Sequence, residues 1–348
     1  MRIAIDAGPM VSGHALRGIG THTRSLVENL KKLGVDIDVI DFSKSDLTKY
    51  VIAHIQSFHP FLLSLPLTKP TKKVVLTIHD LIPLIYPEHY PPGIRGRLIF
   101  FLQRILLRNV DMVITISETS KKDVCRFLGF KPERVKVIYL APREVFKPIE
   151  DSEFLDNVKK KHSLPEKFVL YVGDVNYNKN LLGLAAACKL IKAPLVIVGK
   201  QAASEVVEKD HIENKPFARF LKRYGSDPLI KRVGFVPDEE LVGIYNLASL
   251  YCQPSFYEGF GLSVLEAFAS GCPVVAAKTQ SLVEIAEPAA LFADPKKPKD
   301  MAEKMSLVLT DSVLRNQLIE TGKVFVKNYS WEKTARETLD VYKEVMKK

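Results

Sequence analysis

Long apolar runs and closely spaced cysteines are both missing from this sequence of 348 residues. No uninterrupted apolar run approaches the ~18 residues of a membrane span. Asp6 falls where a signal peptide would carry its apolar region, so we expect a cytoplasmic protein. The cysteines are four and far apart, with no CxxC spacing: Cys125, Cys188, Cys252 and Cys272. This pattern argues against a disulfide framework or zinc site and favours small buried hydrophobic residues.

The net charge of +10 is unevenly distributed along the chain. Residues 1–148 contain 22 Lys and Arg against 13 Asp and Glu, or +9, whereas the remainder contains 28 against 27, or +1. This asymmetry indicates that the first half meets an anionic partner, which could be nucleic acid, a membrane surface or a phosphorylated substrate. No basic run with interleaved aromatics and no nucleic-acid motif is found, so nucleic acid is the least favoured.

Short apolar segments alternate with amphipathic ones throughout the chain. The strand-like segments are residues 3–7, 37–42, 74–78, 112–116, 135–139, 168–172, 195–198, 250–253, 273–276 and 290–292. Such alternation predicts βαβ units and parallel sheets. A chain of 39.1 kDa is larger than one hydrophobic core usually holds, so we expect two domains. A segment with two prolines at 141–148 is a candidate linker. We therefore expect an α/β protein with two doubly wound domains, 1–148 and 149–328, that face across a ligand-binding cleft.

One motif carries most of the chemistry. Glu258 and Glu266 flank a Gly-x-Gly turn that is followed by a helix; the turn residues are Gly259, Phe260, Gly261 and Leu262. Glycines let the backbone approach a ligand, and free N–H groups begin the helix. Such a carboxylate pair could bind two sets of hydroxyls on one sugar-bearing ligand. The alternative is a solvated Glu, a plain turn and a Glu that is salt-bridged on a helix face.

The surroundings of this motif decide between the two interpretations. The sequence resembles the retaining GT-B glycosyltransferases of group 1, or family 4, whose signature is a Glu-x7-Glu pair. Further segments match in order: 18–20 the glycine loop, 77–83 the His-Asp segment, 116–118 the Ser-Glu turn, and 178–180 the diphosphate lysine region. The resemblance implies two Rossmann-like domains and a final helix, residues 329–348, that crosses back to the N-terminal domain.

The resemblance also implies roles for particular residues. Glu258 would hold the hydroxyls of the donor sugar, and Glu266 the ribose hydroxyls of the nucleotide. The backbone of 259–261 would lie against the sugar and phosphate. Lys179 would neutralise the leaving diphosphate, while N–H groups of Gly18 and Gly20 close over it. Fixed donors and a cation at this point lower the barrier to cleavage at the anomeric carbon. No metal or other cofactor is implied.

His79 follows an apolar strand and is the other catalytic candidate. The resemblance implies that it contacts the donor sugar or positions the acceptor, together with Asp80. The alternative is a histidine that is hydrogen-bonded to its neighbouring turn. His14 is a weaker acceptor-site candidate, for which a surface loop is the other interpretation.

The sequence departs from the family at two places. Many members carry Arg after the glycine matched by Gly173, but this chain has Asp174. Lys200, which follows Gly199, is a plausible substitute as the missing cation. The usual Asn-Gly after the last strand of the first domain is replaced by Leu-Ala-Pro-Arg at 140–143, which changes the hinge chemistry.

A segment at 97–108 belongs to the basic half. Arg97, Arg104 and Arg108 fall on one helical face, and apolar residues fill most of the rest. A basic amphipathic helix can lie in an anionic membrane interface, which would make the protein peripheral on the inner membrane face. The alternative is a core helix with a solvated arginine stripe.

Together these features predict a retaining, metal-independent hexosyltransferase that forms an α-glycosidic bond. It would move a hexose from a nucleotide diphosphate sugar, GDP-mannose first and UDP-sugars next, to a glycan or lipid-linked acceptor. The alternatives are a GT-B nucleotide-sugar epimerase or hydrolase, and a non-catalytic basic protein that binds a membrane or nucleic acid.

Overall fold

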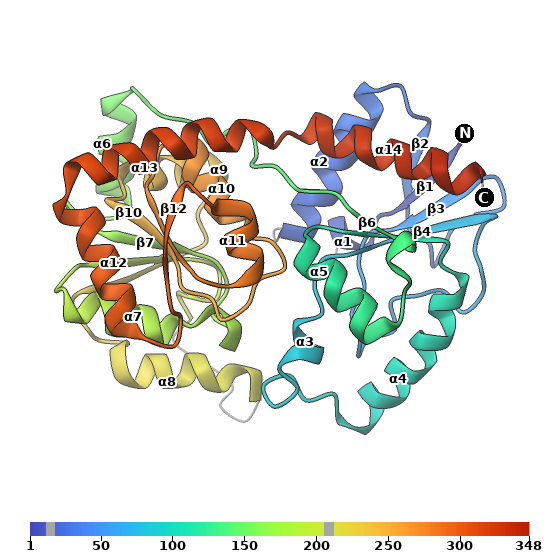
Figure 1. Ribbon diagram of the computed structural model, residues 1–348, viewed down its shortest axis with the longest axis horizontal. Coiled ribbons are helices and arrows are strands. Elements are labelled where there is room, and N and C mark those ends of the chain that lie inside the picture. Colours follow the sequence, from blue (N-terminus) through green and yellow to red (C-terminus); the bar gives the residue numbers. More distant parts are fainter. Residues whose placement is uncertain (12–17, 205–211, 348) are drawn as a thin grey trace. The chain divides into compact units, whose positions relative to one another are not determined.

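The computed structural model describes residues 1–11, 18–204 and 212–347. Their contacts divide the chain into two compact units (Figure 1). Unit 1 comprises Met1–Ala141 and Tyr329–Lys348, and unit 2 comprises Pro142–Asn328. Each unit contains one six-stranded sheet, and all the recorded strand pairings are parallel. The predicted α/β class with two doubly wound units is confirmed.

The sheet of unit 1 has the strand order β2-β1-β3-β4-β5-β6. Its strands are short and mostly buried: β1 (Ile3–Asp6), β2 (Ile37–Ile40), β3 (Ile52–Ile55), β4 (Lys73–Ile78), β5 (Met112–Thr115) and β6 (Val135–Val137). Apolar β-branched residues dominate them because a parallel sheet is covered on both faces.

Helices cover both faces of this sheet. They are α1 (Gly8–Val11), α2 (Gly18–Lys32), α3 (Ile82–Ile85), α4 (Gly93–Leu106), α5 (Glu118–Asp123), which continues as a π-helix (Val124–Leu128), and α14 (Trp331–Lys347). Leu26 and Leu30 of α2 share one core cluster with Tyr342 and Val345 of α14. The last helix of the chain therefore completes the core of the first unit (Figure 1).

The sheet of unit 2 has the order β12-β11-β10-β7-β8-β9. Its strands are β7 (Val169–Val172), β8 (Leu195–Val198), β9 (Ile230–Gly234), β10 (Leu250–Gln253), β11 (Val274–Ala277) and β12 (Ala290–Ala293). Its helices are α6 (Ser152–Lys161), α7 (Leu181–Leu190), α8 (Lys215–Tyr224), α9 (Asp238–Leu247), α10 (Leu262–Ala269), α11 (Gln280–Ala286), α12 (Pro298–Thr310) and α13 (Ser312–Phe325). Residues of α7, α8 and α12 form one core cluster against β7, β8 and β10.

Two strands were missed by the sequence patterns. β3 contains His54, a polar residue that is fully buried, and its neighbour Gln56 is buried as well. β9 is an edge strand in which Lys231 and Arg232 are charged and only partly buried. Polar residues interrupt the apolar pattern at both strands, so no strand was expected there.

The boundary between the units lies at Ala141/Pro142, seven residues before the expected 148. The proposed linker is held by unit 2, because the Ile149 N–H donates to Asn246 Oδ1 at 2.8 Å and Asn246 Nδ2 donates to the Lys147 carbonyl at 3.0 Å. Most of the candidate linker at 141–148 therefore belongs to the second unit.

No helix among the described residues is long and apolar enough to cross a membrane. The four cysteines are unpaired, and Cys188, Cys252 and Cys272 are buried. Burial raises the pKa of all three thiols. They behave as the small hydrophobic residues expected from their spacing.

Two buried histidines connect α14 to the rest of unit 1. His54 Nδ1 lies 2.6 Å from the Tyr342 hydroxyl, and His54 Nε2 lies 2.8 Å from Thr77 Oγ1. His22 stacks on Trp331 with ring centroids 5.9 Å apart. Burial lowers the pKa of both His22 and His54 to about 3, so both rings are neutral at pH 7.

These shifted pKa values make unit 1 sensitive to acid. In the unfolded chain both histidines take up protons below pH 6.5, while in the folded unit they stay neutral until about pH 3. The free energy of unfolding is therefore fully retained above pH 6.5 and falls as the pH drops from 6.5 towards 3. Each histidine should remove on the order of 2 kcal/mol between pH 7 and pH 5.

Urea titrations that follow Trp331 fluorescence measure this effect, because the single tryptophan lies in unit 1. We expect a lower midpoint at pH 5 than at pH 7, and a shallower pH dependence in His54→Gln. An identical midpoint at both pH values in the wild type would contradict the assignment.

Candidate active site

The ends of three neighbouring strands in unit 2 bring the candidate residues together. β10, β7 and β8 are consecutive in the sheet and parallel, so their carboxyl ends share one edge. Lys179 lies in the loop after β7, Lys200 in the loop after β8, and Glu258 in the loop after β10. Ligands of open α/β sheets bind at this edge.

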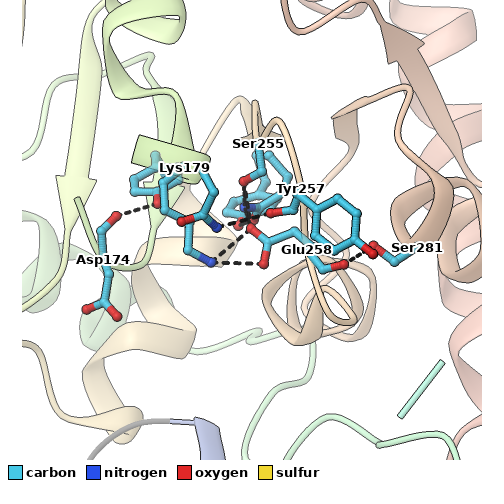
Figure 2. Close-up of polar contacts among 10 residues, drawn as sticks. Asp174, Lys179, Ser255, Tyr257, Glu258 and Ser281 are labelled. Carbon is cyan, nitrogen blue, oxygen red and sulfur yellow. Dashed lines mark hydrogen bonds and ion pairs between the residues drawn. The ribbon is translucent and has the colours of Figure 1, made fainter. Parts of the chain in front are cut away.

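Glu258 is almost completely buried and is satisfied by three side chains (Figure 2). Lys179 Nζ lies 2.9 Å from both carboxylate oxygens. Ser255 Oγ and Gln253 Nε2 donate to Oε1 at 2.6 and 2.9 Å. A buried carboxylate is stable only with such partners, and these three hold the side chain of Glu258 in one position.

The loop that carries Lys179 is joined to the loop of Glu258. Asn178 Nδ2 donates to the Tyr257 carbonyl at 3.1 Å, and the Phe256 N–H donates to the Asn178 carbonyl at 2.8 Å. Asn180 adopts φ +53°, caps α7 and donates to the carbonyls of Pro254 and Pro295. The two neighbours of Lys179 therefore fix its backbone.

The turn after Glu258 needs glycine for backbone reasons. Gly261 has φ +122°, and a Cβ there would lie 2.8 Å from Leu282 Cδ2. Phe260 is buried, and Leu262 begins α10 directly after the turn. Ser281 Oγ donates to the Glu258 carbonyl at 2.7 Å and holds the start of the turn, which leads on to Gly259 (Figure 2).

The backbones after β7 and β8 are in direct contact. A Cβ on Gly199 would overlap the Gly173 carbonyl oxygen, so only glycine allows the two loops to approach this closely. Asp174 follows Gly173, and Lys200, which is exposed, follows Gly199. The Asp174 carboxylate projects away from the Lys179–Glu258 pair (Figure 2).

Glu266 lies in α10 and is paired with Arg143, a residue of the candidate linker at 141–148. Arg143 Nη2 donates to Glu266 Oε1 at 2.7 Å, and Arg143 also pairs with Asp238. The Arg143 guanidinium lies over the Phe146 ring at 4.7 Å from its centroid. Burial raises the pKa of the Glu266 carboxyl, and Arg143 partly offsets that shift. Glu258 and Glu266 thus have separate cations, Lys179 and Arg143.

The candidates of the first half gather in unit 1. His79 directly follows β4 and is buried, with its Nε2 2.8 Å from Nδ1 of His22 in α2. Gly18 and Gly20 form the first described turn of α2 rather than a loop, one turn before His22. The Asp80 carboxylate accepts from the Ile82 N–H at 3.1 Å. His14 lies outside the described residues.

Sequence reasoning missed several residues of these networks: His22, Arg143 as a partner of Glu266, Asn178, Gln253 and Ser255. A signal existed for two of them. Gln253 ends a buried strand and Ser255 follows it, and these polar residues precede Glu258 by five and three residues, within reach of its side chain. Arg143 offered no local signal, since its partner is 123 residues away.

The Arg143–Glu266 pair should contribute strongly to the stability of unit 2. In Arg143→Met, the buried Glu266 carboxylate loses its cation, which should destabilise the unit by on the order of 3 kcal/mol. The double variant Arg143→Met/Glu266→Gln should recover most of this loss, because no buried charge then remains unpaired. Hydrogen exchange of peptides from α10, followed by mass spectrometry, measures the change; wild-type protection in the single variant would disprove the argument.

Two family models match this chain. The family model described as "Glycosyl transferases group 1" matches residues 154–325, and that described as "Glycosyltransferase Family 4" matches residues 43–141. The first match contains Lys179, Glu258 and Glu266, and the second contains His79.

Two relatives are mannosyltransferases of Escherichia coli. O-antigen chain mannosyltransferase B is 28% identical over 281 residues, which are 78% of this chain and 70% of that protein. Serotype-specific mannosyltransferase WbdA is 27% identical over 342 residues, which are 97% of this chain and 41% of that protein. The chain thus spans less than half the length of WbdA.

A solved structure of sucrose-phosphate synthase from Thermosynechococcus elongatus has a TM-score of 0.77 at 19% identity and covers 99% of both chains. Likeness at this identity shows the fold, which is GT-B. With the two family matches and the strand-end residues that they contain, the chain belongs to the group 1 glycosyltransferases of family 4.

Proposed function

We propose that this chain is a retaining hexosyltransferase whose donor is a nucleotide diphosphate sugar, with GDP-mannose first and UDP-sugars next. The acceptor is a glycan or a lipid-linked glycan, and the product is an α-glycoside. The observation that carries the proposal is the pair formed by the buried Glu258 and the part-buried Lys179, beside the glycine turn at 259–261. The two mannosyltransferase relatives support mannose as the sugar.

The pair offers complementary groups for a sugar diphosphate. Glu258 Oε1 accepts hydrogen bonds from Ser255, Gln253 and Lys179. Glu258 Oε2 accepts a hydrogen bond from Lys179. When a donor binds, the Lys179 ammonium turns to the diphosphate, and Oε2 accepts hydroxyls of the sugar in its place. A flexible lysine stem allows this exchange, while Glu258 stays fixed by its two neutral partners.

The reaction breaks the bond between the anomeric carbon and the diphosphate oxygen. The acceptor hydroxyl oxygen forms the new bond from the same face, and its proton leaves with the diphosphate. Positive charge grows on the sugar ring while negative charge grows on the leaving oxygen. Glu258 stabilises the first through the hydroxyls, and Lys179 with Lys200 stabilises the second. This assignment needs no metal ion.

Lys200 compensates for the acidic residue at 174. Its loop touches the loop of Asp174 through the close contact of Gly199 and Gly173, so its ammonium can reach the same edge of the sheet. Glu266 holds the ribose hydroxyls of the nucleotide. Unit 1 carries the residues assigned to the acceptor, His79 and Asp80, and the backbone N–H groups of Gly18 and Gly20.

A thermal-shift screen of GDP-, UDP-, ADP- and dTDP-sugars without added metal identifies the donor. We expect GDP-mannose to stabilise the protein, by about 2.7 kcal/mol at one hundred times its dissociation constant. Lys200→Gln should weaken binding about tenfold, because one charged contact to the diphosphate is lost. Lys192→Gln is the matched control, since this exposed lysine lies at the opposite end of β8. No response to any nucleotide sugar would refute the proposed donor class.

Glu258→Gln should lower the rate of nucleotide release from the identified donor by 10²-fold or more, as expected for the loss of a fixed charge at the reacting sugar. The glutamine keeps the shape and an oxygen for Ser255, so the melting temperature should change little. Full turnover by this variant would show that Glu258 is not catalytic. Free sugar that accumulates at the full rate without an acceptor would instead favour a hydrolase.

A further inference from the structure

The helix α4 presents its apolar side chains to solvent. Ile94, Leu98 and Phe101 have exposed fractions of 82%, 66% and 68%, and Leu102 and Ile105 are exposed as well. They are spaced i, i+4, i+7, i+8 and i+11, which places them on one face of a helix. The opposite face, which packs on the unit, contains Gly96, Gln103 and Leu106. This is the reverse of an ordinary surface helix.

A neighbouring loop with exposed apolar residues of its own is held against the inward face of α4. Gln103 Nε2 donates to the carbonyls of His59 and Pro60 at 2.8 and 2.9 Å, and its Oε1 accepts from the Ser64 N–H at 2.8 Å. Phe61 packs edge-on against Phe100 of α4, with centroids 6.1 Å apart. These contacts hold the loop against the helix at residues on both sides of Leu62 and Leu63, which are exposed, as is Leu67.

We call the eight exposed apolar residues of these two segments the α4 surface: Leu62, Leu63, Leu67, Ile94, Leu98, Phe101, Leu102 and Ile105. They are eight of the fourteen large apolar side chains that the described part of the chain exposes. The other six are scattered over the N-terminus and unit 2. A concentration of this kind marks an interaction site rather than ordinary surface composition.

Arginines flank the apolar face of the helix. At 100° per residue, Arg97 and Arg104 fall on one side of the stripe and Arg95 on the other, and Arg108 follows in the next turn. Residues 89–110 contain no acidic residue, and neither do residues 57–72. The α4 surface is therefore apolar at its centre and cationic at its rim.

We propose that the α4 surface binds in the interface of a bilayer that contains anionic phospholipids. Its apolar side chains would enter the acyl boundary and its arginines would pair with lipid phosphates, which is the pattern of helices that lie in the membrane plane. With 14 residues α4 is about 21 Å long, shorter than a ~30 Å hydrocarbon core. It would therefore lie along the surface.

Charge favours a lipid surface over a second copy of the chain. In a symmetric dimer through α4, the arginine rows of both copies would face each other without acidic partners from the same segments. An anionic bilayer offers phosphates to all of them at once. This proposal needs no transferase activity, so its test is independent of the proposed function.

Cosedimentation with sucrose-loaded vesicles tests it. We expect the full chain to bind vesicles of 70% phosphatidylcholine and 30% phosphatidylglycerol at least tenfold more tightly than pure phosphatidylcholine vesicles, and to lose most of this preference in 0.5 M salt. Leu98→Ser/Phe101→Ser should weaken binding at least tenfold. Arg97→Gln and Arg104→Gln should each weaken it about fivefold.

The matched control is Val313→Ser/Val324→Ser, which removes two equally exposed apolar side chains from α13 in unit 2 and should bind as the wild type does. An unchanged urea midpoint by Trp331 fluorescence shows that each α4 variant is folded. The proposal is overturned if the wild type binds neither vesicle, or if Leu98→Ser/Phe101→Ser binds as well as the wild type. It is also overturned if vesicle binding is absent and sedimentation velocity shows a dimer that Phe101→Ser dissociates.

Discussion

A buried carboxylate in water-poor surroundings must be satisfied, and the arrangement of unit 2 around Glu258 follows from this requirement. Its Oε1 accepts hydrogen bonds from Gln253 at the end of β10 and from Ser255 in the loop that follows. Both of its oxygens pair with the ammonium of Lys179 in the loop after β7. Asn178 and Asn180 then fasten the second loop to the first. The charge thus joins loops from two strands that are remote in sequence. The same partners that stabilise the folded unit hold the carboxylate in one position.

The second carboxylate of the motif is held in a different way. Glu266 is buried in α10, and its cation comes from Arg143, the second residue of unit 2. Arg143 belongs to the Leu-Ala-Pro-Arg segment that stands in place of the Asn-Gly expected from the family resemblance, so in this chain that segment supplies the cation of Glu266. A charge that is buried in the helix therefore fixes the path of the chain as it enters the second unit.

Part of the positive charge of the first half is concentrated on α4 and the residue that follows it closely, Arg108. Four arginines with no acidic neighbour in residues 89–110 surround the exposed apolar face of α4. Sequence reasoning placed three of these arginines on one face of a helix and left a core helix with a solvated arginine stripe as the alternative. Burial shows the apolar residues outside and Gln103 inside, because Gln103 binds the backbone of the loop at 59–64. Helical periodicity alone cannot say which face of a helix packs inward when both faces contain apolar residues.

What the sequence by itself determined is the class of fold, most of the strands, and the residues near the carboxyl ends of the strands in unit 2. All three can be predicted from local features of the sequence: hydrophobic periodicity, and glycine and glutamate residues at a fixed spacing. The partners of the site residues were decided only by the tertiary structure. Ser255 is close to Glu258 in sequence, but Lys179 is 79 residues away, Arg143 is 123 residues from Glu266, and His22 is 57 residues from His79. The strand β3 was missed for a related reason, since its polar residue His54 is buried by contacts with Thr77 and Tyr342 from distant segments. A polar side chain is stable inside a protein only through partners, and those partners exist only once the sheets and helices have assembled.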